Sequence, residues 1–254
     1  LAEKNGFHVS FIDAPAKQYN EEQSLSVVTK EAQNTPLFVL DTRTPSINSD
    51  IRFAEKVKAL NPQAKIVMVG THPTATVEET LTKAKAVDMI ARREYDATIL
   101  ELASALRDGK DWQGIRGLSY KDDTGIVNNP DREPIVDLDD IPMAAKFIKE
   151  HLNVYDYAFP AATYPAIQIF AGRGCPARCN YCVYPQVMHG HVYRKRSAAN
   201  VVAEFEYIAK EFPEVKEIVI EDDTFTIDKE RVIEICQMLI DKGLSKRFRW
   251  LCNA

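Results

Sequence analysis

Residues 172–182 read Gly-Arg-Gly-Cys-Pro-Ala-Arg-Cys-Asn-Tyr-Cys, so three cysteines, Cys175, Cys179 and Cys182, stand in a C-x3-C-x2-C spacing. Thiolate is the usual protein ligand of iron–sulfur clusters. Three thiolates on one short loop can hold three irons of a four-iron cluster, and the fourth iron then stays open to a small molecule. We therefore predict that these cysteines bind a [4Fe-4S] cluster.

The same cysteines also allow a zinc site, a disulfide or free thiols. A structural zinc ion needs four ligands, and His189 or His191 could complete a Cys3His set, but zinc sites usually pair two ligand turns. A disulfide would need an oxidising compartment. Of the two remaining cysteines, Cys236 is interpreted as a small buried hydrophobe, and the role of Cys252 is left open.

The composition argues against several classes of partner. The chain has 254 residues and a formal net charge of -5, whereas general nucleic-acid or membrane-surface binders present a basic face. No apolar run reaches the roughly 20 residues of a membrane span, and residues 1–6 read as the end of a helix with a glycine stop, not as a signal peptide. We expect a cytoplasmic protein, since a reducing compartment also suits an oxygen-sensitive cluster.

Residues 1–114 alternate expected strands with expected helices, a pattern typical of a doubly wound parallel α/β sheet. A flavodoxin-like domain of this kind normally has five strands, with the first strand at the centre. Because only four strands are found and the chain begins at the end of a helix, we expect that the first strand is missing. Strands are expected at residues 8–13, 36–41, 65–70 and 87–91, and helices at 21–32, 50–60, 78–86 and 97–106.

Residues 166–254 form a second series of strands and helices, reached through a hairpin and a proline-rich connector at residues 115–165. The first strand of this series leads directly into the cysteine loop. Two and a half strand–helix units cannot close a βα barrel, so we expect the N-terminal part of a truncated barrel. Strands are expected at residues 166–171, 216–220 and 247–252, and two helices begin at the caps Ser197 and Asp228.

The cysteine spacing, with the aromatic Tyr181 directly before the last cysteine, resembles the cluster loop of the radical S-adenosylmethionine (SAM) superfamily. The resemblance implies that the amino and carboxylate groups of SAM chelate the open iron. Three acids, Glu221, Asp222 and Asp223, follow the next strand, and ligand sites in α/β sheets lie beyond the carboxyl ends of strands. We expect them to accept hydrogen bonds from the SAM ammonium, where radical SAM barrels carry a Gly-Gly-Glu-like segment. A solvated acidic turn is the alternative.

A basic segment follows the cysteine loop. Lys195 is interpreted as a surface residue. For Arg194 and Arg196, a surface position, contact with a substrate carboxylate and pairing with the acidic turn are all left open. His189 and His191 are most often plain loop residues in such a place, and metal binding or proton transfer is the minor alternative.

Two loops of the first domain combine small hydroxyl residues with a glycine, at the ends of adjacent strands. They read Asp-Thr-Arg-Thr-Pro-Ser at residues 41–46 and Gly-Thr-His-Pro-Thr at residues 70–74. Such loops let a bulky planar ligand approach the backbone closely, although ordinary turns contain the same residues. The candidate contacts are Thr42, Thr44, Ser46, Gly70, Thr71, His72 and Thr74, together with Glu94 after the next strand.

Together these motifs resemble the cobalamin-binding (B12-binding) radical SAM proteins, and the resemblance covers essentially the whole chain. The segment Tyr184-Pro185-Gln186, followed by Gly190-His191, is similar to the hopanoid-biosynthesis-associated branch of that family. The family implies that cobalamin is held over the mouth of a partial βα barrel, facing the cluster and SAM. The matching segments are residues 41–46, 69–74, 172–175, 193–197 and 222–226.

The resemblance implies an enzyme that cleaves SAM reductively at the cluster and forms a 5′-deoxyadenosyl radical. That radical takes a hydrogen atom from a small-molecule or lipid-like substrate, and methylcobalamin then supplies a methyl group to an unactivated carbon. The electron comes from a donor such as flavodoxin or ferredoxin. Other members of the family catalyse a rearrangement or ring formation without net methylation.

Proteins of other classes share some of these features. An iron–sulfur electron-transfer protein normally ligates every iron, and no fourth cysteine stands in a suitable place. A methylthiotransferase acting on tRNA resembles the same barrel but has further cysteines in its N-terminal domain, whereas no cysteine precedes Cys175 here. A cobalamin-binding module with an inactive barrel is the third alternative.

Overall fold

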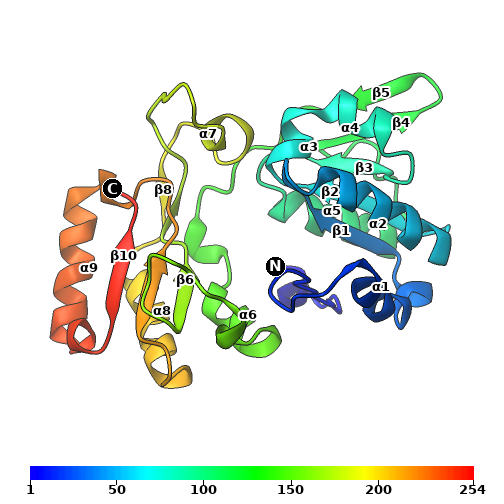
Figure 1. Ribbon diagram of the computed structural model, residues 1–254. Helices are drawn as coiled ribbons and strands as arrows, with labels where there is room; N and C mark the ends of the chain where they lie inside the picture. Colours follow the sequence, from blue (N-terminus) through cyan, green and yellow to red (C-terminus); the bar gives the residue numbers. More distant parts are fainter. The chain divides into compact units, whose positions relative to one another are not determined.

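The structure, a computed structural model, describes residues 1–254. The chain forms two compact units, whose elements are labelled in Figure 1. Unit 1 contains residues 1–135 and 180–189, and unit 2 contains residues 136–179 and 190–254. The segment expected as a hairpin and connector is therefore divided between the two units. None of the helices is both long enough and apolar enough to cross a lipid bilayer.

Unit 1 is built on a five-stranded sheet whose strands lie side by side in chain order. Strands β1, β2 and β3 run parallel, and the hairpin β4–β5 continues the sheet antiparallel to β3. The parallel strands and the hairpin confirm the expectation from the sequence. The strands are β1 (Leu37–Asp41), β2 (Lys65–Val69), β3 (Met89–Ala91), β4 (Leu118–Asp122) and β5 (Gly125–Asn128).

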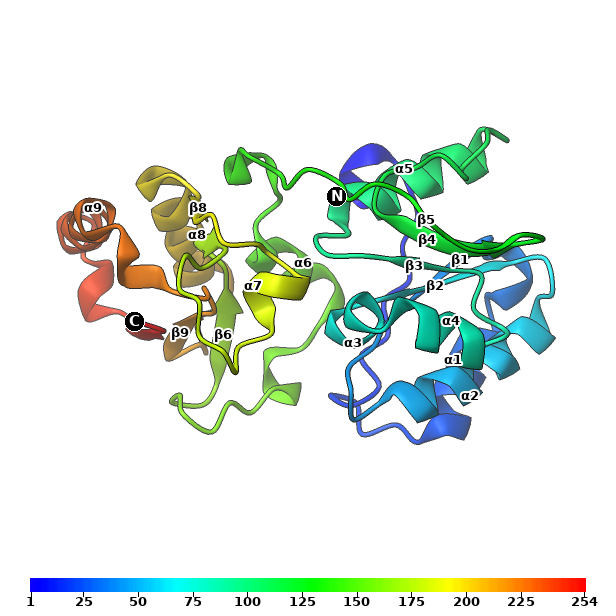
Figure 2. The same cartoon turned by 90° about the horizontal axis from the view of Figure 1, so that it is seen from above.

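Helices cover both faces of this sheet, because successive residues of a strand point to opposite faces. In β2, Val67 and Val69 share a core with α5, whereas Ile66 and Met68 share a second core with α2 and α4. Figure 2 shows α5 on one side of the sheet and α1, α2 and α4 on the other. The α-helices of unit 1 are α1 (Glu21–Thr29), α2 (Ile47–Leu60), α3 (Thr71–Ala75), α4 (Val77–Lys83), α5 (Asp96–Arg107) and α7 (Tyr184–Val187).

Two expectations for unit 1 are wrong. Residues 8–13 do not form a strand: no strand of the sheet pairs with them, and Phe11 is 48% exposed. A strand needs a neighbouring strand for its ladder hydrogen bonds. Residues 8–13 do not add to either edge of the sheet, which ends with β1 on one side and β5 on the other. The sheet therefore has three parallel strands in place of the four expected. Residues 70–74 were expected as a loop, but a short helix, α3 (Thr71–Ala75), begins directly after Gly70.

Unit 2 contains a parallel sheet in the order β10-β9-β6 and a two-stranded antiparallel ribbon, β7–β8. Helices α6, α8 and α9 pack with this sheet around one apolar core. The alternation of strands and helices is as predicted, whereas α6 forms within the expected connector. The elements are α6 (Ala144–His151), β6 (Ala166–Ile169), β7 (Gly172–Arg173), β8 (Arg194–Lys195), α8 (Ala198–Glu211), β9 (Glu217–Ile220), α9 (Lys229–Asp241) and β10 (Arg249–Cys252).

The two faces of the unit 2 sheet differ in character. Ile167 and Ile169 point into the helical core, whereas Gln168 between them is exposed, so it lies on the opposite face. Cys252 packs against the helical core, and burial raises the pKa of its thiol. The cysteine whose role the sequence left open therefore lies on the helical side of the sheet.

Both predicted helix caps of unit 2 are confirmed. The Ser197 hydroxyl accepts a hydrogen bond from Asn200 N at 3.1 Å, at the start of α8. The Asp228 carboxylate accepts one from Arg231 N at 3.0 Å, at the start of α9. These caps satisfy backbone donors that a helix leaves unpaired in its first turn. Each helix therefore begins where its capping residue stands in the sequence.

Candidate functional site

The cysteine loop runs from β7 to α7. All three of its cysteines are free thiols; Cys179 is exposed, and Cys175 and Cys182 are half-buried. Cys175 and Cys179 belong to unit 2, and Cys182 belongs to the segment 180–189 of unit 1. Three accessible sulfur donors on one loop suit an iron–sulfur cluster. The cluster itself stays a prediction.

Backbone contacts hold the loop at each end. Cys175 N donates to Gly190 O at 3.2 Å, and a ring nitrogen of His191 lies 3.1 Å from Ala177 O. In unit 1, Gln186 Nε2 donates to the carbonyl of Cys182 at 3.0 Å. His191 therefore has a backbone partner in this loop, which fits its interpretation as a loop residue.

The three acids after β9 have different surroundings. Asp222 is 1% exposed, and its carboxylate accepts a hydrogen bond from Ala171 N at 2.7 Å. Asp223 accepts one from Gly174 N at 3.1 Å, next to the first cysteine. Both carboxylates thus bind the backbone that leads into the cysteine loop. Burial is the main cause that raises the pKa of Asp222, while the backbone N–H donors of Ala171 and Gly172 act in the opposite direction.

Glu221 is half-buried and differs from the other two acids in its hydrogen-bond partner. Its carboxylate accepts a hydrogen bond from Gln168 Nε2 at 3.0 Å, and Gln168 lies on the sheet face opposite the helices. Glu221 N donates to Ile169 O at 2.9 Å, which fixes the residue at the carboxyl end of β6 and β9. Glu221 thus lies toward the sheet face opposite the helices, whereas Asp222 binds the loop backbone, and the contact of Glu221 with SAM stays a prediction.

The basic segment after the loop is mostly structural. Arg196 is buried and pairs with Glu204 of α8, not with the acidic turn. Lys195 pairs with Asp228 at the surface, in line with its expected role. Arg194 lies opposite Arg173 in the β7–β8 ribbon.

Sequence reasoning missed two residues beside the cysteine loop, Tyr193 and Arg231. Arg231 Nη2 donates to Ala171 O at 2.7 Å, and Arg231 Nη1 donates to the Tyr193 hydroxyl at 2.7 Å. A signal for Arg231 was present, since it shares the buried stripe of α9 with Ile235 and Leu239 at a spacing of four residues. A charged residue on an apolar stripe is a sign of a buried polar partner.

In unit 1, the two hydroxyl-rich loops lie against each other. Thr42 N donates to Val69 O at 2.9 Å, and Thr44 Oγ1 lies 3.1 Å from His72 Nδ1. Gly70 has φ +107°, and a Cβ there would lie 2.6 Å from Thr42 O. Glycine is therefore required at this contact, and the structure brings residues 41–46 and 70–74 together as predicted.

The remaining candidates of this domain are also at the carboxyl ends of the strands. The Ser46 hydroxyl donates to Asp50 Oδ2 at 2.7 Å, and the Thr74 hydroxyl accepts from Arg93 N at 3.2 Å. Glu94 is 7% exposed. Ser46, Thr74 and Thr44 all have partners within the protein, and Thr44 is the most exposed of the three, just after the end of β1.

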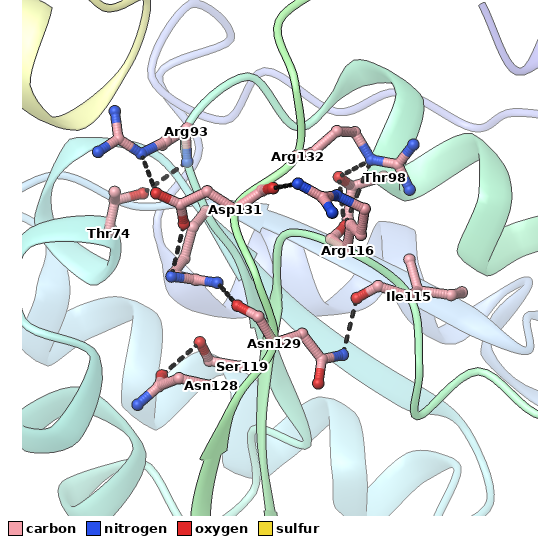
Figure 3. A network of polar contacts seen from close by, with 11 residues as sticks. Thr74, Arg93, Thr98, Ile115, Arg116, Ser119, Asn128, Asn129, Asp131 and Arg132 are labelled. Carbon is pink, nitrogen blue, oxygen red and sulfur yellow. Dashed lines mark hydrogen bonds and ion pairs between the residues drawn. The ribbon is translucent and has the colours of Figure 1, made fainter.

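An ion-pair network that the sequence did not predict fixes the loop after β3 (Figure 3). Asp131 pairs with Arg92 at 2.7 Å and with Arg93 at 2.8 Å, and the Asp131 carbonyl accepts from Arg116 at 2.7 Å. Arg93 also donates through its backbone to Thr74. The network therefore connects the chain after β5 to the loops after β2 and β3, next to Glu94.

Curated relatives cover nearly the whole chain. An uncharacterized methyltransferase of Pyrococcus horikoshii is 31% identical over 241 residues, which are 93% of this chain and 50% of that protein. The anaerobic magnesium-protoporphyrin IX monomethyl ester cyclase of Rubrivivax gelatinosus is 30% identical over 240 residues, which are 93% of this chain and 42% of the cyclase. This chain thus spans half or less of the length of these relatives. No family model matches the chain.

Solved structures share the fold. The radical SAM methyltransferase TsrM from Kitasatospora setae, with cobalamin and a [4Fe-4S] cluster bound, has a TM-score of 0.74 at 18% identity, covering 98% of this chain and 49% of TsrM. The cobalamin-dependent SAM radical enzyme OxsB, with aqua-cobalamin and SAM bound, has a TM-score of 0.75 at 17% identity, covering 94% of this chain and 33% of OxsB.

The fold is shared with solved radical SAM enzymes, and the spacing of the cysteine loop resembles that of their cluster loop. With the curated relatives, these observations place the chain in the cobalamin-dependent, B12-binding radical SAM family, as the sequence predicted. The hopanoid-associated branch stays a prediction.

Proposed function

We propose that this protein is a cobalamin-dependent radical SAM enzyme that transfers a methyl group to an unactivated carbon of a small-molecule or lipid-like substrate. The observation that carries the proposal is the loop of three free cysteines. The two other cysteines of the chain lie on α9 and β10, in unit 2, where Cys252 packs into the helical core. The loop thus offers three thiolates, which leaves one iron of a four-iron cluster for SAM.

Glu221 is the residue that we propose holds the ammonium of SAM. Its carboxylate lies at the carboxyl end of β9, and the hydrogen bond from Gln168 orients it on the open face of the sheet. An ionised carboxylate is a strong acceptor for an ammonium donor. Tyr181 is 87% exposed and offers an aromatic ring beside the last cysteine. When bound, the cluster supplies one electron to SAM and cobalamin supplies the methyl group.

The loops after β1 and β2 are the proposed seat of cobalamin. Gly70 lets the chain after β2 lie directly on the backbone of Thr42, and Thr44 Oγ1 lies 3.1 Å from His72 Nδ1, so the two loops form one compact surface. A planar macrocycle can approach such a surface closely. Thr42, Ser46, Thr71, Thr74 and Glu94 complete the proposed set, as the family resemblance implies.

A second candidate function is ring formation or rearrangement without net methylation. The observation that favours it is the likeness to anaerobic magnesium-protoporphyrin IX monomethyl ester cyclases, of which the Rubrivivax gelatinosus protein is 30% identical. Both candidates share the cleavage of SAM and the need for an electron donor such as flavodoxin or ferredoxin. They differ in whether a methyl group leaves SAM for the substrate.

The test uses the full-length protein, reconstituted anaerobically with iron, sulfide and cobalamin and given SAM and a chemical reductant. We expect 5′-deoxyadenosine from the native protein and none from Cys175→Ala, Cys179→Ala or Cys182→Ala. Cys236→Ala, on α9, is the matched control and should keep the native yield. Undiminished 5′-deoxyadenosine from any of the three loop variants would refute the proposed site. Methyl-labelled SAM separates the two candidate functions, because label enters the substrate only in methyl transfer.

A further inference from the structure

We propose that Asp222, Tyr193 and Arg231 form a positioning network that fixes the backbone before Cys175 and so enables the loop to retain its cluster. The inference rests on the proposed function, because it assumes that the loop binds a cluster. None of the three residues is proposed to touch the cluster or SAM. They act on residues 171–174, which connect β6 to the first cysteine.

The network consists of a buried cation and a buried carboxylate bridged by a phenol. Arg231 is 4% exposed and Asp222 is 1% exposed. Arg231 Nη1 donates to the Tyr193 hydroxyl at 2.7 Å, and this hydroxyl donates to Asp222 Oδ2 at 3.3 Å. Tyr193 therefore joins two opposite charges that would otherwise be poorly paired in the interior, where an unpaired polar group is costly.

Two of the three residues, Asp222 and Arg231, hold the backbone of Ala171 from both sides. Asp222 Oδ1 accepts from Ala171 N at 2.7 Å, and Arg231 Nη2 donates to Ala171 O at 2.7 Å. Asn253 Nδ2 donates to the carbonyl of Asp222 at 2.9 Å and fixes it from the neighbouring strand end. Ala171 is thus held through its N–H and its C=O, four residues before Cys175.

The Tyr193 ring occupies the place where a side chain at position 172 would lie. A Cβ at Gly172 would lie 2.6 Å from the Tyr193 hydroxyl and 2.7 Å from Tyr193 Cε2, far inside van der Waals contact. The ring therefore lies directly on the backbone of the loop. The glycine that opens the cysteine motif is required by this contact, so the motif and Tyr193 form one packing unit.

This arrangement gives Asp222 a role other than the one expected from sequence. An acid that contacts SAM would present its oxygens to the open face, as Glu221 does. Asp222 instead directs them at the loop backbone and at Tyr193. Its replacement should therefore weaken retention of the cluster, and leave the affinity of the remaining clusters for SAM unchanged.

The experiment compares Tyr193→Phe, Asp222→Asn and Gly172→Ala in the full-length protein, purified and reconstituted anaerobically. Iron and sulfide per chain and the rate of cluster loss to an iron chelator are measured. The paramagnetic resonance signal of the reduced cluster is then titrated with SAM. Removal of one partner of a buried hydrogen bond predicts cluster loss about tenfold faster in Tyr193→Phe. Circular dichroism checks that each variant is folded, and Tyr193→Phe keeps the test valid if Asp222→Asn does not fold.

The matched control is Tyr164→Phe. The Tyr164 hydroxyl also donates one hydrogen bond, to Tyr155 O at 2.8 Å, but it precedes the amino end of β6, at the other end of that strand from the cysteine loop. The Tyr164→Phe variant should lose its cluster at the same rate as the native protein. Native retention by Tyr193→Phe and Gly172→Ala would overturn the inference. Full retention by Asp222→Asn with weakened SAM response would show a SAM contact instead. A native protein without any cluster would refute the proposed function first.

Discussion

Replacement of Arg196 by methionine gives a direct test of the interior of unit 2. Arg196 pairs with Glu204, and their side chains are 7% and 0% exposed. Glu204 also accepts a hydrogen bond from Ala145 N at 2.8 Å, which attaches α6 to α8. Arg196→Met leaves the Glu204 charge buried without its partner. Loss of one member of such a pair costs about 3–5 kcal/mol.

The double variant Arg196→Met/Glu204→Gln isolates the charge. The glutamine carbonyl can still accept from Ala145 N, while no charge is left in the interior. Because a buried ion pair is itself worth little against a neutral replacement, the double variant should be more stable than Arg196→Met alone. Free energies of unfolding from urea titration, followed by circular dichroism, provide the measurement. A loss below about 1 kcal/mol in Arg196→Met, or a double variant no more stable than the single one, would refute this reasoning.

Three further predictions concern unit 1. Gly70→Ala should cost more stability than Gly109→Ala in thermal unfolding, because both have positive φ but only the Gly70 Cβ meets backbone, at 2.6 Å from Thr42 O; equal losses would contradict the contact between the two loops. Asp131→Asn removes both ion pairs to Arg92 and Arg93 and, since the Asp131 side chain is 44% exposed, should cost about 1 kcal/mol, whereas Glu133→Gln, whose side chain is 88% exposed, should change the unfolding free energy by less than about 0.5 kcal/mol. Burial raises the pKa of the Asp50 carboxyl in the folded protein. The folded state therefore binds the carboxyl proton more tightly than the unfolded state does, and the free energy of unfolding falls as pH rises through this pKa. Asp50→Asn should therefore unfold at higher urea than the native protein at neutral pH, with the difference vanishing below about pH 3.9; a difference that persists there would contradict the assignment.

The sequence predicted elements well where a strand or helix is defined by its own residues. Strand β2 and helix α5 follow from a Val- and Ile-rich run and from an amphipathic pattern, and Ser197 and Asp228 marked the starts of α8 and α9. Residues 8–13 have the same apolar character as a strand, but strand formation also depends on a neighbour, which no local pattern reveals.

Some residues of the candidate site could likewise be predicted from the sequence and others could not. The cysteine motif and the two hydroxyl-rich loops could be found from sequence, because spacing and residue type carry their chemistry. The contacts of Tyr193 could not, since Asp222 and Arg231 lie 29 and 38 residues from it along the chain. Glu221 and Asp222 have different partners because neighbouring side chains point to opposite faces of a sheet. A shift of one residue would exchange the two faces.

The proposed function requires a four-iron cluster that is bound by three protein ligands and has one iron open to SAM. Mössbauer spectroscopy of anaerobically purified protein, reconstituted with isotopically enriched iron, tests it most directly. We expect a [4Fe-4S] spectrum in which one iron site changes its parameters when SAM is added. A protein without such a cluster, or a cluster whose four iron sites are unaffected by SAM, would contradict it.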